Sequence, residues 1–105
     1  MTKDPQITAT VKEVLDLVKS ISPGKSVELR VPPYGVIQCV AGGNHRRGTP
    51  PNTVEMSGQT LVRLINEPSL WASLCDSGEV RASGLLSDLS NVLAQPSVKF
   101  RDKSS

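Results

Sequence analysis

The chain has 105 residues and a formal net charge of +2, and 37% of its residues are hydrophobic while 3% are aromatic. This length predicts one domain over residues 1–105, large enough to form a single core without disulfides or metal. Scattered arginines and only one Trp, one Tyr and one Phe argue against nucleic acid as a partner, because that function needs clustered basic residues and aromatic rings that stack on bases.

The first residues and the cysteines bear on the compartment. Residues 1–6 are polar and do not resemble a signal peptide, and no apolar run approaches the roughly 20 residues that a bilayer span needs. Cys39 and Cys75 both lie in apolar settings, which is typical of reduced, buried thiols. We therefore expect a cytoplasmic protein with no stable membrane insertion.

The N-terminal part is predicted to be a helix. Asp4 and Pro5 suit the cap and the first helical position, and Ser22-Pro23-Gly24 is a stop signal. The apolar residues between them fall on one helical face: Ile7, Val11, Val14, Leu15, Val18 and Ile21. A single apolar stripe predicts that the helix lies on a sheet.

Residues 27–41 predict a hairpin. In 27–31 apolar and charged residues alternate, so Leu29 should face the core while Glu28 and Arg30 face water. The tight Pro-Pro-Tyr-Gly stretch at 32–35 separates this strand from a second, apolar one at 36–41. Because both faces of the second strand are apolar apart from one residue, we expect it to be the more central of the two.

A loop rich in glycine and proline follows at 42–52 and carries the only histidine. Its polar residues include His45, Arg46, Arg47 and Thr49. Guanidinium groups match phosphate and carboxylate geometry, and glycines let backbone N–H groups approach an anion. A basic pair in a loop is more often simply solvated. The sequence leaves both interpretations open.

The second half of the chain predicts alternating short elements. A third strand is expected at 53–56, and helices at 57–67 and 69–77 are separated by a proline. A fourth strand at 79–83 and a helical stripe at 85–93 come next. Val98 and Phe100 could add a last short strand.

The apolar stripes of these helices either pack as a core or line a cavity for an apolar ligand. The residues concerned are Leu61, Leu64, Ile65, Trp71, Leu74, Leu86, Leu89 and Leu93. Amphipathic helices usually just pack, so the pattern alone favours a filled core.

No complete catalytic or metal constellation is present in the sequence. Cys39 and His45 lack a third group to orient the imidazole, and one histidine with two distant cysteines gives no metal-ligand spacing. We therefore expect a protein that is not an enzyme and has no metal or cofactor.

Four blocks carry a resemblance: VELRVPPYGVIQCV at 27–40, HRRGTPPN at 45–52, the helix of Trp71, and GEVRASGLLSDLS at 78–90. Together they resemble a bacterial branch of the sterol carrier family, in particular small actinobacterial proteins. The resemblance implies an α/β (α+β) fold, with a mainly antiparallel sheet of four to five strands and helices packed on one face. In the wider family a tunnel between sheet and helices takes sterols, fatty acids or acyl-CoA.

The resemblance therefore implies non-catalytic binding of an apolar or acyl ligand, with the eight stripe residues lining its cavity. The four polar loop residues would then hold its head group. Two alternatives stay open: a protein-interaction module with a filled core, and an accessory domain related to mycothiol-dependent isomerase proteins. The sequence does not specify the ligand, the oligomeric state or the pathway.

Overall fold

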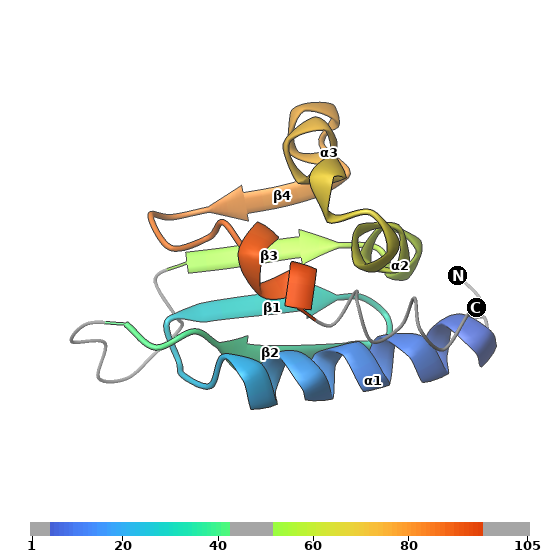
Figure 1. Ribbon diagram of the computed structural model, residues 1–105, viewed down its shortest axis with the longest axis horizontal. Helices are drawn as coiled ribbons and strands as arrows, with labels where there is room; N and C mark the ends of the chain where they lie inside the picture. Colours follow the sequence, from blue (N-terminus) through green and yellow to red (C-terminus); the bar gives the residue numbers. More distant parts are fainter. Residues whose placement is uncertain (1–4, 43–51, 96–105) are drawn as a thin grey trace.

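The computed structural model describes residues 5–42 and 52–95. Figure 1 labels the elements, and their bounds are α1 Pro5–Ile21, β1 Val27–Val31, β2 Gly35–Cys39, β3 Asn52–Met56, α2 Gly58–Asn66, the 3-10 helix η1 Pro68–Leu70, α3 Trp71–Ser77 and β4 Val80–Ser83. A final helical stretch covers 90–95. In this part of the chain, no helix has the length and apolar character needed to cross a membrane.

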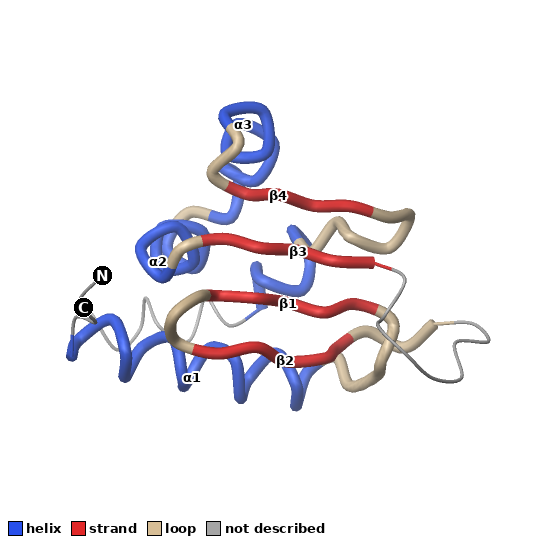
Figure 2. Tube along the Cα trace, turned by 180° about the vertical axis from the view of Figure 1, so that it is seen from behind, coloured by secondary structure: helices blue, strands red, loops and turns tan. Residues whose placement is uncertain are grey.

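The sheet has four strands in the order β2-β1-β3-β4. The β1–β2 and β3–β4 pairs are antiparallel, whereas the central β1–β3 pair is parallel. The helices lie on one face of the sheet, and in Figure 1 the 90–95 stretch lies in front of β1 and β3. Figure 2 shows the molecule from behind, with the strands in front of the helices. The expected α+β fold, with a mainly antiparallel sheet covered by helices on one face, is confirmed.

The expected central position of the second strand is wrong, because β2 is an edge strand. Its side chains alternate between the two faces, and Val36 is 56% exposed on the face that the described helices leave open. A continuous apolar run does not distinguish a strand buried on both faces from an edge strand that exposes one valine.

The predicted register of the first strand is confirmed. Val27, Leu29 and Val31 are fully buried on the helix side of β1. Glu28 and Arg30 lie on the opposite face, where they form an ion pair with each other. Four of the six residues predicted on the apolar face of α1 are buried, namely Val11, Val14, Leu15 and Val18, whereas Ile7 and Ile21 near its ends are half-buried.

Local signals set the ends of the short helices. The Ser57 hydroxyl accepts a hydrogen bond from the Thr60 N–H at 3.1 Å, which caps α2. Pro68 begins η1, and Gly78 ends α3 with a φ of 86°, a conformation that glycine adopts without strain. These turns place α3 against β4 and α2 against α1.

The helical stripe predicted at 85–93 is only partly correct. Leu85 and Leu86 are 101% and 43% exposed, and they lie in a turn, while the helix begins only at residue 90. Gly84, with a φ of 107°, turns the chain immediately after β4, so the first two leucines cannot share the apolar face of the later ones. The last strand expected from Val98 and Phe100 lies outside the described residues.

Candidate functional site

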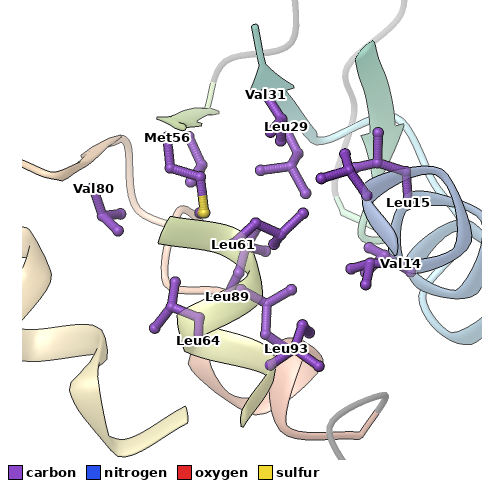
Figure 3. Close-up of a cluster of buried hydrophobic side chains, with 14 of the residues drawn as sticks. Val14, Leu15, Leu29, Val31, Met56, Leu61, Leu64, Val80, Leu89 and Leu93 are labelled. Carbon is purple, nitrogen blue, oxygen red and sulfur yellow. The ribbon is translucent and has the colours of Figure 1, made fainter. Parts of the chain in front are cut away.

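The interior between the sheet and the helices is an apolar layer. Figure 3 shows Leu61 and Leu64 of α2 together with Leu89 and Leu93 of the last segment, beside side chains of β1 and α1. The predicted cavity residues on α2 and α3 are all buried there, and the most exposed of them, Trp71, has 8% of its surface in contact with solvent. Seven of the eight predicted residues belong to this core, and the exception is Leu86.

Two hollows lie on the surface of the described residues, and neither is lined by the predicted apolar residues. One, of about 480 Å³, runs from Arg30 and Thr53 on the open face towards Cys75 beside β4. The other, of about 440 Å³, lies near Pro32 and Ser57 at the end of the sheet. Both share Glu55, Gly78 and Arg81, so they are open grooves around β4 and do not lie within the core.

Paired charges line the open face of the sheet. Arg30 of β1 lies opposite Glu55 of β3, which lies opposite Arg81 of β4. The Arg81 guanidinium donates to the Glu55 carboxylate at 2.6 Å, and Arg30 pairs with Glu28. Because each of these charges already has a partner in the sheet, the face has little net attraction for a charged ligand.

No sequence pattern singled out Asn52, yet its side chain joins three segments at one end of the sheet. Its side chain is 4% exposed, its Nδ2 donates to the Ser26 carbonyl at 2.8 Å, and its Oδ1 accepts from the Leu86 N–H at 3.0 Å. A Cβ at Gly84 would lie 2.2 Å from the same Oδ1, so only glycine fits there. Asn52 therefore ties the start of β3 to the turn before β1 and to the turn after β4.

Residues 84–95, here called the covering segment, close the interior over β1 and β3 (Figure 1). Its hydrogen bonds include short local ones, from the Ser87 hydroxyl to the Gly84 carbonyl at 2.7 Å and from the Leu93 N–H to the Leu89 carbonyl at 2.9 Å. Leu89 and Leu93 are fully buried. Burial of these two leucines, together with the bond from the Leu86 N–H to Asn52, holds this wall of the interior in place.

The four polar loop residues, His45, Arg46, Arg47 and Thr49, lie outside the described residues. Both ends of their loop are described, at Gly42 and Asn52. A Cβ at Gly42 would lie 2.0 Å from the Ser26 hydroxyl and 3.1 Å from the Leu86 Cδ1. The loop therefore leaves the sheet next to the start of the covering segment.

The two cysteines are free, and burial raises the pKa of both thiols. Cys39 is fully buried, and its pKa rises to about 11. Desolvation has the largest effect on the pKa of Cys75, and the nearby Asp88 carboxylate raises it further. A thiol with a raised pKa is protonated at neutral pH and is therefore a poor nucleophile.

The raised pKa of Cys39 predicts a loss of stability at alkaline pH. Below about pH 8.5 the folded and unfolded states both keep this proton. As the pH rises to about 11, the unfolded state releases it first, so the free energy of unfolding should fall by roughly 2–3 kcal/mol. Denaturant titrations between these pH values measure the effect. Cys39→Ala should reduce the slope, and an unchanged slope in this variant would contradict the assignment.

Comparisons with known proteins agree with this architecture. Residues 3–95 match the model of a family described as bacterial SCP ortholog, where SCP stands for sterol carrier protein. A solved structure titled UbiJ-SCP2 Ubiquinone synthesis protein is similar in fold, with a TM-score of 0.54 and 20% sequence identity over 97% of this chain and 98% of that chain. A search of curated proteins gave no significant match. Since the family match spans nearly all of the described residues, the chain belongs to the bacterial SCP orthologs of the sterol carrier family.

Proposed function

We propose that the protein binds an apolar or acyl ligand in the interior between sheet and helices, without catalysing a reaction on it. The ligand class comprises lipids, fatty acids, acyl-CoA and sterol-like molecules. The observation that carries the proposal is the covering segment, which fills the interior with Leu89 and Leu93. Membership of the sterol carrier family supports it.

In this mechanism the tail of the ligand takes the place of the two leucines of the covering segment. The tail would then contact the buried leucines of α2, such as Leu61 and Leu64, and those of α3. Exposing two leucines costs about 3–6 kcal/mol, whereas each buried methylene contributes about 0.8 kcal/mol. A tail therefore needs roughly four to eight buried methylenes before it gains any affinity.

The head group would remain at the mouth of the interior, with the polar loop residues His45, Arg46, Arg47 and Thr49. This part of the proposal rests on where the loop is attached, because Gly42 lies beside Leu86 at the start of the covering segment. An anionic head would pair with Arg46 or Arg47, since guanidinium forks match carboxylate and phosphate.

A series of saturated fatty acids of increasing length tests the proposal. Burial of the tail predicts that affinity rises about tenfold for every two added methylenes, because these contribute about 1.6 kcal/mol. The emission of Trp71, the single tryptophan, gives a saturable signal from the interior. Native mass spectrometry of protein purified from its own host shows whether a lipid is retained.

Two comparisons separate the parts of this proposal. Replacing both Arg46 and Arg47 with alanine should weaken binding of the acids but not of alcohols with the same chain length. The alternative function, an interaction module with a permanently filled core, predicts no length dependence. Absence of both a retained lipid and a Trp71 response would reject ligand binding and favour that module.

A further inference from the structure

Two adjacent leucines project into solvent at one end of the sheet. Leu85 is 101% exposed and Leu86 is 43% exposed, in the turn that follows β4. Turns are usually built from glycine, proline and small polar residues. We call residues 84–87 the leucine turn.

The leucine turn is held in this outward position by hydrogen bonds. The Leu86 N–H donates to the buried Asn52 side chain at 3.0 Å. The Ser87 hydroxyl and N–H both donate to the Gly84 carbonyl, at 2.7 Å and 3.3 Å. Because the backbone is fixed at both ends of the turn, Leu85 cannot fold back onto the core.

The surroundings of the leucine turn carry basic residues. Ser26 and Leu86 both lie beside Gly42. The exposed Lys25, which precedes Ser26, therefore lies at this end of the molecule. Lys19 lies in the last turn of α1, just before that connection, and Figure 1 shows the connection at the same end of the sheet as the turn after β4. Asp88 is the acidic residue next to the turn.

We propose that the leucine turn docks the protein reversibly on an anionic lipid bilayer, with Leu85 and Leu86 entering the interface between head groups and acyl chains. Lys25 would lie against the lipid phosphates. Apolar side chains combined with basic residues are what a peripheral protein needs, because either signal alone gives only marginal membrane affinity.

The position of the turn connects docking to the interior. Only Ser87 and Asp88 separate Leu86 from Leu89, whose side chain fills the interior. Movement of the leucine turn in the bilayer would therefore also move Leu89, in the buried part of the covering segment. This link rests on the proposed function, in which an apolar ligand takes the place of Leu89 and Leu93, and the bilayer would be the source or acceptor of that ligand.

Vesicle co-sedimentation of the full chain tests the docking. The probes are vesicles of phosphatidylcholine alone and of phosphatidylcholine with phosphatidylglycerol, at low salt and without added fatty acid. Leu85→Ser should lower the partition coefficient at least about tenfold, since one leucine side chain is lost from the apolar phase. Lys25→Gln should weaken binding roughly fivefold, and only to the phosphatidylglycerol vesicles.

Val36→Ser is the matched control. Val36 is also an exposed apolar residue, 56% accessible. It lies in β2 opposite Arg30, away from the leucine turn. Its replacement should leave vesicle binding unchanged. Because Leu85 is fully exposed, Leu85→Ser should not alter the circular dichroism spectrum or the unfolding midpoint.

Three results would overturn the docking: wild-type protein that does not sediment with phosphatidylglycerol vesicles, equal binding by wild type and Leu85→Ser, or a concentration-dependent dimer that Leu85→Ser abolishes. The last result would assign the turn to a second copy of the chain. Failure of the proposed function is measured separately, by the fatty acid series without vesicles. Vesicle binding that depends on Leu85 in a protein that binds no fatty acid would confirm the docking and reject the ligand site.

Discussion

Replacing Trp71 with alanine should lower the free energy of unfolding by about 3–5 kcal/mol, because a large buried side chain is lost and a cavity remains. Trp71 is 8% exposed and lies where η1 meets α3. Its indole belongs to the same apolar core as Leu64 and Val80. In a domain of this size such a loss is comparable with the whole stability.

Chemical denaturation followed by circular dichroism measures this loss, since the variant has no tryptophan to report by fluorescence. Trp71→Phe keeps most of the apolar volume and should cost much less. Ser73→Ala, on the exposed side of α3, is a surface control that should change little. Wild-type emission typical of indole in water would contradict the burial of Trp71.

Replacing Asn52 with alanine should cost about 2–4 kcal/mol, because it leaves two backbone groups without their partner. The Ser26 carbonyl and the Leu86 N–H both bond to this side chain, and Asn52 itself is 4% exposed. Unpaired backbone groups near the interior carry the full cost of lost hydration. The effect should be largest at the end of the sheet where the leucine turn lies.

Hydrogen exchange distinguishes this local effect from general loss of stability. Relative to wild type, Asn52→Ala should accelerate exchange of the Leu86 amide more than exchange of amides at the centre of β1, such as that of Leu29. Thr53→Ala changes the neighbouring residue on the open face and should have a small effect. Equal stability of Asn52→Ala and Thr53→Ala would show that the Asn52 side chain does not hold the three segments together.

The sequence was a sufficient guide wherever a local pattern determines the structure. Alternation in 27–31 placed Leu29 inside and Arg30 outside, since the side chains of a strand alternate with a period of two. The single apolar stripe of α1 placed Val14 and Val18 against the sheet. Ser57, Pro68 and Gly78 act on backbone groups within a few residues, so the bounds of α2 and α3 were also predictable.

Contacts between distant residues were decided only by the tertiary structure. β2 is an edge strand because β3 pairs with the other side of β1, and nothing local to 36–41 encodes that choice. Leu85 and Leu86 do not lie on the predicted apolar face because the backbone turns at Gly84 and the Leu86 N–H bonds to Asn52. Asn52 is 34 residues away from Leu86 in the sequence. Such a bond depends on which segments the fold brings together.

The candidate site shows the same division between pattern and tertiary contact. Apolar spacing identified seven of the eight predicted residues as parts of one interior, because burial follows helical periodicity. Whether that interior is empty or filled depends on the volumes that Leu89 and Leu93 bring to it from a separate segment. The sequence by itself therefore determined which side chains face inward. Only the packing of the covering segment against α1, α2 and the sheet decided that leucines occupy the space, since volume is shared among residues far apart in the chain.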